Sequence, residues 1–216
     1  MERPVLYHSG MKAEPVGFER LGDAGVIART ALARALHADL AAALPRGATE
    51  SVPALGSVTV LYDALSTTPE ELETDLRARL ARLKRARRAP GPLIQLPTVY
   101  DGPDLPQVAR LAGMSEAGVI AAHAKTVFEV AFLGFLPGFA YLTGLPPQLQ
   151  LSRRGAPRER VEAGSVAIGG PWGGVYPLAS PGGWHVLGHT SVKLFDPSSP
   201  SPTLLRPGDR VRFVPL

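Results

Sequence analysis

The chain has 216 residues, of which 45% are hydrophobic and 19% charged, the composition of a globular protein with enough chain for one or two packed cores. The absence of cysteine excludes disulfides, zinc–thiolate sites, iron–sulfur clusters and a cysteine nucleophile. The net charge of +4 does not indicate nucleic-acid binding, because the basic residues between positions 77 and 88 spread around several faces of a predicted helix.

No stretch of the sequence predicts a membrane span or a secretory signal. The longest apolar run, residues 127–142, is broken by Glu129 and by a turn rich in glycine and proline. It is also shorter than the ~20 residues that a membrane-crossing helix needs. The N-terminus has no apolar signal segment. We therefore expect a cytoplasmic protein that binds neither membranes nor nucleic acids, with residues 1–15 as a flexible tail.

Residues 16–97 predict an α+β domain of the ferredoxin-like, split βαβ type. Gly22 and Asp23 separate two β-prone runs, which is typical of a tight turn between strands. The following elements then give the order strand, helix, strand, strand, helix, strand. The expected strands cover residues 16–21, 25–28, 50–52, 57–62 and, as the closing strand, 93–96.

Two helices are expected in this domain. The first follows Thr30 and is stopped by Pro45. The second begins at Thr68, which can cap it, while Pro69 suits the first helical position and Glu71 completes a capping box. Leucines at helical spacing form their apolar faces: Leu32, Leu36, Leu40 and Leu44 in the first, and Leu72, Leu76, Leu80 and Leu83 in the second.

Residues 98–216 predict a mostly-β barrel that follows two short helices. Asp104 and Ser115 can cap these helices, and Gly113 can end the first of them. Beyond residue 125, short apolar runs alternate with glycine and proline, which is typical of a closed or nearly closed barrel. The expected strands are residues 127–133, 165–168, 185–187, 192–195 and 211–214.

Common catalytic signatures are missing from the sequence. It has no phosphate-binding P-loop motif, and Ser165 lacks the glycine spacing of a hydrolase nucleophile elbow. His185 and His189 would lie ~13 Å apart on a strand, which is too far for one metal ion. We expect no metal on this chain and interpret both histidines as polar residues at the barrel rim.

Two other features have both a structural and a functional interpretation. His123 ends a predicted helix, where it is either a partly buried group bonded to a helix-end carbonyl or a general acid or base. Residues 134–142 and 180–184 are rich in glycine and aromatic residues. Such stretches form tight barrel corners, and they also let backbone amides approach a ligand while the rings exclude water.

Several motifs, in order along residues 16–216, resemble those of one known family. They are Pro103-Asp104-Leu105, His123, residues 134–146, Pro157-Arg158, residues 164–168, Val175-Tyr176-Pro177, residues 180–184 and residues 207–213. On these residues the chain resembles the B subunit of the prokaryotic ATP-dependent 5-oxoprolinase. The family is also called allophanate hydrolase subunit 1 and KipI, a histidine-kinase inhibitor.

The resemblance implies a cyclophilin-like barrel on the C-terminal side, in agreement with the turn spacing. It also implies a heteromeric enzyme in which the B subunit acts with an A subunit and with a C subunit similar to KipA or allophanate hydrolase subunit 2. The complex opens 5-oxo-L-proline to L-glutamate at the expense of ATP, with Mg²⁺. We expect the chain to be inactive alone and to carry neither biotin nor a bound metal, although the module also resembles the carboxyltransferase part of urea carboxylase.

The resemblance and the glycine-rich stretches together predict one wall of an active-site pocket shared with a partner chain. A lactam is resonance-stabilised, so opening it requires polarisation of the amide and control of water. We expect His123, Tyr176 and Ser180 to be catalytic. The expected substrate-binding residues are Phe135, Pro137, Gly138, Phe139, Tyr141, Arg158, Ser165, Pro181, Gly182, Gly183, Trp184 and His189.

Specific roles follow for some of these residues. Arg158 would bind a carboxylate or phosphate through its planar guanidinium group. Backbone amides of Gly138, Gly182 and Gly183 would face the substrate or a developing oxyanion. His189 stands where the family commonly has arginine, so it could replace that cation in a pH-dependent way.

Other functions stay open at this point. The chain could be a regulatory protein that binds and inhibits a sensor histidine kinase, as KipI does, or a carboxyltransferase-type protein that acts on a urea-derived amide. Co-purification with the C subunit would favour the enzyme, whereas capture of a kinase by the chain alone would favour the regulator. Peptidyl-prolyl isomerase activity ranks below these, because a barrel fold does not by itself confer an activity.

Overall fold

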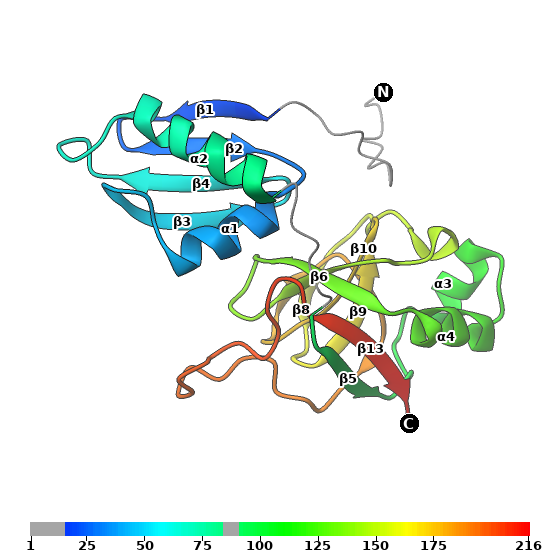
Figure 1. Ribbon diagram of the computed structural model, residues 1–216. Helices are drawn as coiled ribbons and strands as arrows, with labels where there is room; N and C mark the ends of the chain where they lie inside the picture. The colour runs from blue at the N-terminus through cyan, green and yellow to red at the C-terminus, as the bar shows by residue number, and fades with distance from the viewer. Residues whose placement is uncertain (1–15, 84–90) are drawn as a thin grey trace. The chain divides into compact units, whose positions relative to one another are not determined.

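The chain divides between residues 89 and 90 into two units, each with its own sheet and its own core (Figure 1). The computed structural model describes residues 16–83 and 91–216. The expected flexible tail, residues 1–15, lies outside the described residues. Each unit is therefore described separately below.

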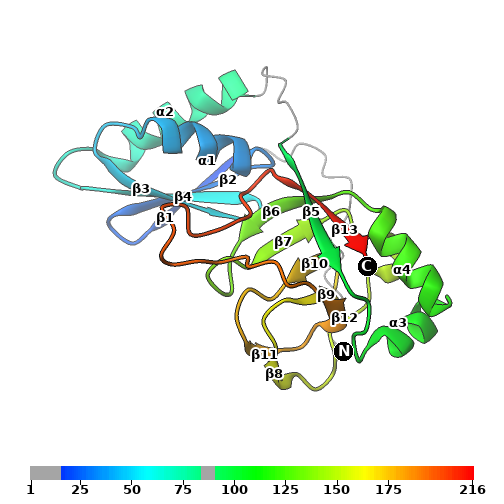
Figure 2. The same ribbon diagram turned by 90° about the horizontal axis from the view of Figure 1, so that it is seen from below.

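The first unit is a four-stranded antiparallel sheet whose two helices cover the same face (Figure 2). In space the strands follow the order β1-β2-β4-β3, so β4 lies between β2 and β3 and is antiparallel to both. β2, α1 and β3 thus form the predicted split βαβ unit. The elements are β1 (Gly17–Leu21), β2 (Gly25–Arg29), α1 (Ala33–Ala42), β3 (Ala48–Ala54), β4 (Ser57–Tyr62) and α2 (Pro69–Leu83).

The strand beside β2 at the sheet edge is β1, and not the closing strand expected at residues 93–96. β1 and β2 form a hairpin in which Gly17 lies opposite Arg29 and Leu21 opposite Gly25. Because this pairing joins adjacent segments, it costs little loop-closure entropy and fills the edge that a later strand would have taken. Residues 93–98 instead pair within the second unit, so the units separate earlier than the expected boundary after residue 97.

The predicted leucine faces pack against this sheet. Leu36, Leu40, Leu72, Leu76 and Leu80 are buried together with valines of β2 and β4. At the start of α2 the capping box is complete in both directions. The Glu71 backbone N–H donates to Thr68 Oγ1 at 3.3 Å, and the Thr68 backbone N–H donates to Glu71 Oε2 at 3.1 Å.

Replacing Thr68 by Ala is expected to lower the free energy of unfolding of the first unit by about 1 kcal/mol, because the Glu71 N–H loses its partner at the helix start. Denaturant titrations followed by far-UV circular dichroism measure the change. Thr74→Ala is the matched control: Thr74 is an exposed residue inside α2, where alanine is the better helix former. Equal losses in the two variants would contradict a capping role.

The second unit is built on a seven-stranded sheet that closes into a barrel. Its strands are β5 (Leu93–Thr98), β6 (Phe128–Leu133), β7 (Ala140–Thr143), β9 (Ser165–Gly169), β10 (Trp172–Val175), β12 (His185–His189) and β13 (Arg210–Pro215), in the order β12-β9-β10-β7-β6-β13-β5. The edge strands meet where Val99, just after β5, exchanges two backbone hydrogen bonds of 2.9 and 2.8 Å with His189. Residues 192–195, expected as a strand, contribute only an isolated bridge between Phe195 and Thr203.

Short elements outside the barrel position the loops around it. They are α3 (Leu105–Ala112), α4 (Glu116–Lys125), the 3₁₀ helix Pro147–Leu149, and the two-stranded ribbon of β8 (Arg158–Val161) and β11 (Ser180–Gly182). Gly113, with φ +65°, ends α3, and Ser115 Oγ accepts the Gly118 N–H at 3.1 Å at the start of α4, both as predicted. Among the described residues, every helix is too short or too polar to cross a membrane.

Candidate functional site

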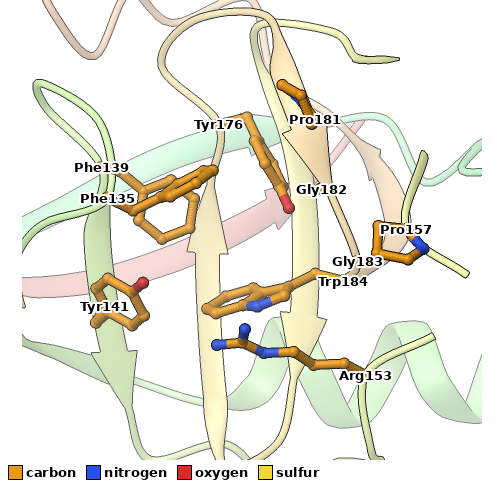
Figure 3. Close-up of a pocket in the computed structure, with 10 residues that line it drawn as sticks. All are labelled: Phe135, Phe139, Tyr141, Arg153, Pro157, Tyr176, Pro181, Gly182, Gly183 and Trp184. Carbon is orange, nitrogen blue, oxygen red and sulfur yellow. The ribbon is translucent and has the colours of Figure 1, made fainter. Parts of the chain in front are cut away.

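A pocket of about 190 Å³ lies beside the barrel, where the turn at 134–139, the loop at 151–157 and the segment from β11 to β12 meet (Figure 3). Its walls are mainly aromatic. The lining residues are Phe135, Phe139, Tyr141, Arg153, Pro157, Tyr176, Pro181, Gly182, Gly183 and Trp184. Both glycine-rich stretches singled out in the sequence thus contribute to one pocket.

Phe139 organises the aromatic wall. Its ring lies edge-on to Tyr176 and to Trp184, with centroid separations of 5.3 and 5.4 Å. Edge-to-face contacts of this kind are favourable beyond the area that they bury. Phe139, Tyr176 and Trp184 are buried and belong to one hydrophobic cluster. The wall is therefore a rigid surface rather than a set of loose surface rings.

Phe135 stands at the mouth of the pocket in a strained backbone conformation. Its φ is +70°, and the Leu136 N–H donates to the Gly134 carbonyl across it at 2.9 Å. This is the γ-turn form with positive φ, which is rare for a residue with a side chain. The turn leaves Phe135 60% exposed, while its ring makes an edge-to-face contact with Phe139. The pocket thus presents an apolar side chain to whatever covers its mouth.

Tyr176 places a phenol oxygen in the pocket because residue 182 is glycine. A Cβ at Gly182 would lie only 2.3 Å from Tyr176 Oη. The Oη accepts a hydrogen bond from the Trp184 backbone N–H, and burial raises the pKa of the phenol above its ordinary value. Tyr176 is therefore protonated at neutral pH, with its own hydrogen available to a ligand's acceptor.

Trp184 forms the floor of the pocket and carries a cation on one side. The indole lies against Gly169, where an added Cβ would come within 2.7 Å of the ring. The guanidinium carbon of Arg153 is 6.0 Å from the Trp184 ring centroid, within the range of a cation–π contact (Figure 3). The pocket thus combines flat apolar surfaces with one positive charge.

Arg158 does bind a carboxylate with its planar guanidinium group, as expected, but the carboxylate belongs to Asp104. Two 2.8 Å hydrogen bonds join Arg158 to Asp104, Arg154 adds a third at 2.6 Å, and the Val186 backbone N–H donates a fourth at 2.8 Å. Asp104 is only 2% exposed. Burial alone would raise its pKa, but the hydrogen bonds and the two arginine charges hold the pKa below its usual value.

This arrangement corrects two expectations. The Asp104 side chain makes no capping hydrogen bond at α3, because all of its described contacts are with Arg154, Arg158 and Val186. Arg158, fully engaged with Asp104, is not among the residues that line the pocket. Through these hydrogen bonds, Asp104 at the start of α3 is joined to the loop at 151–157, to β8 and to β12.

His123 does not lie at the pocket, in contrast to its expected place beside the substrate. It is fully buried in the barrel core, with ring centroids of Phe128 and Phe213 at 5.0 and 4.5 Å. Its Nδ1 is 2.8 Å from the Tyr100 hydroxyl, whereas no described group lies within hydrogen-bond distance of Nε2. Burial lowers the pKa of His123 to about 3, so the ring is neutral at physiological pH.

The buried His123 predicts a loss of stability on mild acidification. Between pH 6.5 and about 3 the unfolded chain binds a proton at this histidine and the folded chain does not. The free energy of unfolding should therefore fall as the pH is lowered from 6.5, by up to about 1.4 kcal/mol per pH unit. Urea titrations at pH 7 to 5, followed by the fluorescence of Trp172 and Trp184, measure the unfolding of this unit.

His123→Gln, which cannot titrate, should flatten this pH dependence, whereas His189→Gln, at an exposed histidine, should leave it unchanged. A wild-type unfolding free energy that stays constant from pH 6.5 to 5 would contradict the interpretation.

The remaining expected site residues do not line the pocket. Ser180, in β11, donates its hydroxyl to the Pro181 carbonyl at 3.1 Å. Ser165 is buried within β9. His189 is exposed, with Nδ1 2.9 Å from Asp101 Oδ1, and so lies at the barrel rim. Pro137 and Gly138 belong to the turn that carries Phe135 and Phe139, but do not themselves line the pocket.

Sequence reasoning missed two lining residues, Arg153 and Pro157. Both belong to the loop that precedes β8, which has no regular periodicity. The signal was a pair of arginines and a glycine, Arg153-Arg154-Gly155, just before the quoted Pro157-Arg158 motif. In the part of the chain that the structure describes, no group of three or more histidine or acidic side chains could hold a metal ion.

Comparison with known proteins extends the resemblance that the motifs suggested. The family described as the carboxyltransferase domain, subdomain C and D, matches residues 18–205. The chain is 49% identical to the 5-oxoprolinase B subunit of Escherichia coli O157:H7 over an alignment of 172 residues that covers 77% of each protein.

Solved structures share the fold. The crystal structure of TTHA0988 matches with a TM-score of 0.80 and 40% identity over 89% of this chain, which spans only 40% of the length of TTHA0988. The urea amidolyase of K. lactis matches with a TM-score of 0.72 over 95% of this chain and 16% of the amidolyase, and at 18% identity this similarity shows the fold alone.

The matched region contains both the split βαβ unit and most of the barrel, including all of the pocket residues. The motifs, the two-unit architecture and the identity to a curated relative therefore agree. The chain belongs to the family of the 5-oxoprolinase B subunit, which carries the carboxyltransferase domain, subdomain C and D.

Proposed function

We propose that this chain is the B subunit of an ATP-dependent 5-oxoprolinase that opens 5-oxo-L-proline to L-glutamate together with the C and A subunits. The observation that carries the proposal is the pocket. All of its lining residues except Arg153 lie in the motifs that resemble the 5-oxoprolinase B subunit, and that subunit is a curated relative of this chain. Its aromatic walls suit a small flat ring, and its polar side chains are few.

The groups in the pocket suit polarisation of a lactam. The Tyr176 hydroxyl, protonated and fixed by the Trp184 N–H, can donate to the ring carbonyl of the substrate. A hydrogen bond at this oxygen withdraws electrons from the amide and favours charge that develops there during ring opening. Phe135, Phe139 and Trp184 exclude bulk water, which strengthens that interaction. In this proposal Tyr176 binds and polarises, and it does not act as a base.

The pocket does not suit ATP with Mg²⁺. Among its lining residues there is one cation, Arg153, and no carboxylate that could ligate Mg²⁺. A triphosphate commonly needs several cations or a row of backbone amides at a glycine-rich loop. We therefore propose that this pocket receives the lactam and that ATP is bound elsewhere in the assembled enzyme.

Reconstitution of the complex tests the proposal. The chain is co-expressed with candidate C and A subunits, and glutamate release from 5-oxo-L-proline is measured with and without ATP. Glutamate should appear only with ATP and only when all three proteins are present. An assembled three-protein complex that releases no glutamate would overturn the proposal, as would the capture of a sensor histidine kinase by this chain in place of the C subunit.

A further inference from the structure

Arg153 differs from the two arginines that follow it in the same loop. Arg154 and Arg158 both form ion pairs with the buried Asp104. Arg153 forms no ion pair with any described residue, and it is the one charged side chain among the residues that line the pocket. No described carboxylate therefore neutralises Arg153 at the pocket, whereas Arg154 and Arg158 are both paired with Asp104.

The backbone on both sides of Arg153 is fixed. The Nε2–H of His185, a buried residue of β12, donates to the Ser152 carbonyl at 2.9 Å. On the other side, the Arg154 N–H donates to the Gly183 carbonyl at 2.8 Å, and the Arg154 side chain is held by Asp104. The loop thus places the Cα of Arg153 at the pocket edge and leaves only the side chain to be ordered by a ligand.

The surroundings of the Arg153 guanidinium favour an anion. The Trp184 ring lies beside the guanidinium, with 6.0 Å between the guanidinium carbon and the ring centroid (Figure 3). The positive charge of Arg153 also acts on the Tyr176 phenol, which lines the same pocket. Arg153 is an exposed residue at the pocket edge, so its guanidinium is open to an incoming ligand on the side away from Trp184. A planar guanidinium matches a carboxylate with two parallel hydrogen bonds.

We propose that Arg153 recognises the carboxylate of a small ring acid in this pocket and so makes the pocket selective for the acid over the corresponding neutral lactam. The inference rests on the proposed function for its substrate and deepens it, because it names the residue that distinguishes 5-oxo-L-proline from 2-pyrrolidinone. The ring would lie against Phe139 and Trp184, with its carbonyl toward Tyr176 and its carboxylate toward Arg153.

Ligand binding to the full chain tests the inference without turnover. Trp172→Phe leaves Trp184 as the single indole, and its fluorescence follows titrations with 5-oxo-L-proline and with 2-pyrrolidinone. The acid should bind at least about tenfold more tightly than the neutral lactam. Adding Arg153→Gln should remove this preference. Equal binding of the two compounds, or no binding of either, would overturn the inference whatever the complex does.

Steady-state kinetics of the complex give a second readout. Arg153→Gln should raise KM for 5-oxo-L-proline by about ten- to a hundredfold and change kcat much less, since the carboxylate lies away from the reacting amide. Arg153→Lys should recover part of the loss. Arg160→Gln is the matched control, because Arg160 is an exposed arginine of β8 that pairs with Glu162 and lies outside the pocket.

The outcomes separate this inference from the proposed function. A wild-type complex that opens the lactam while Arg153→Gln keeps an unchanged KM would overturn the inference alone. A complex that opens no lactam would overturn the proposed function, and the fluorescence titrations then decide the role of Arg153. If Arg153→Gln instead prevents co-purification with the C subunit and leaves both ligand affinities unchanged, Arg153 binds an acidic group of the partner chain and the inference is wrong.

Discussion

Replacing Tyr176 by Phe is expected to lower kcat for lactam opening in the assembled enzyme by about a hundredfold or more, with a much smaller change in KM. The substitution removes only the hydroxyl that, in the proposed function, donates to the ring carbonyl of the substrate, and it keeps the ring that packs against Phe139. Loss of one such donor typically costs two to three orders of magnitude in rate when the bond strengthens in the transition state. Initial rates of ATP-dependent glutamate release measure the effect.

Two further variants make this prediction specific. Tyr62→Phe removes the hydroxyl of a buried tyrosine in the first unit and should leave kcat unchanged. Gly182→Ala keeps the Tyr176 hydroxyl but displaces it, because the added methyl would lie 2.3 Å from Oη, so its kcat should fall as well. A Tyr176→Phe complex with kcat within twofold of wild type would show that the lactam carbonyl is polarised by another group.

Local signals predicted the elements of the fold well. The capping box of Thr68 and Glu71 could be recognised in the sequence, because both of its hydrogen bonds join residues that are only three positions apart. It marks the start of α2. Gly113 ends α3 for a similarly local reason, since it adopts a positive φ that residues with a side chain rarely adopt. Such features need no knowledge of the rest of the chain.

Long-range pairing was harder to predict. By its composition, the β-prone run at 93–98 fits the edge of either sheet. Only its parallel pairing with β13 assigns it to the barrel, and in that pairing Leu93 lies opposite Arg210, 117 residues further along the chain. Strand propensity describes a half-buried pleated surface and does not specify a partner. For this reason the split βαβ unit was predicted correctly, whereas its edge strand was not.

The candidate site shows the same division. Glycines and aromatic residues that cluster in one stretch indicate a pocket wall in the sequence, and residues 134–142 and 180–184 both contribute lining residues. Polar side chains are different, since their role depends on partners distant in sequence. Arg158 is bound to Asp104, 54 residues away, whereas Arg153 lines the pocket and forms no ion pair with a described residue. His123 is enclosed by Phe128 and Phe213, and its spacing in the sequence indicated neither neighbour.

Asp104→Asn is expected to have the largest effect on stability, lowering the free energy of unfolding of the barrel unit by about 3 kcal/mol. The amide keeps the shape of the carboxylate but not its charge, so Arg154 and Arg158 are left close together without a counterion. Removing one partner of a buried ion pair costs about 3–5 kcal/mol. The low end applies here because each arginine keeps about a quarter of its side chain exposed to water.

Urea titrations followed by tryptophan fluorescence measure this change, with Asp101→Asn as the control. Asp101 pairs with His189 at the surface and should contribute less than about 1 kcal/mol. Because Asp104 also holds Arg154, and with it the backbone beside Arg153, Asp104→Asn should raise KM for 5-oxo-L-proline under conditions in which the variant is fully folded. An Asp104→Asn protein as stable as Asp101→Asn would show that solvent, and not this carboxylate, neutralises the two arginines. An unchanged KM would show that the hydrogen bonds of Ser152 and Gly183 alone hold the loop at 151–157 in place.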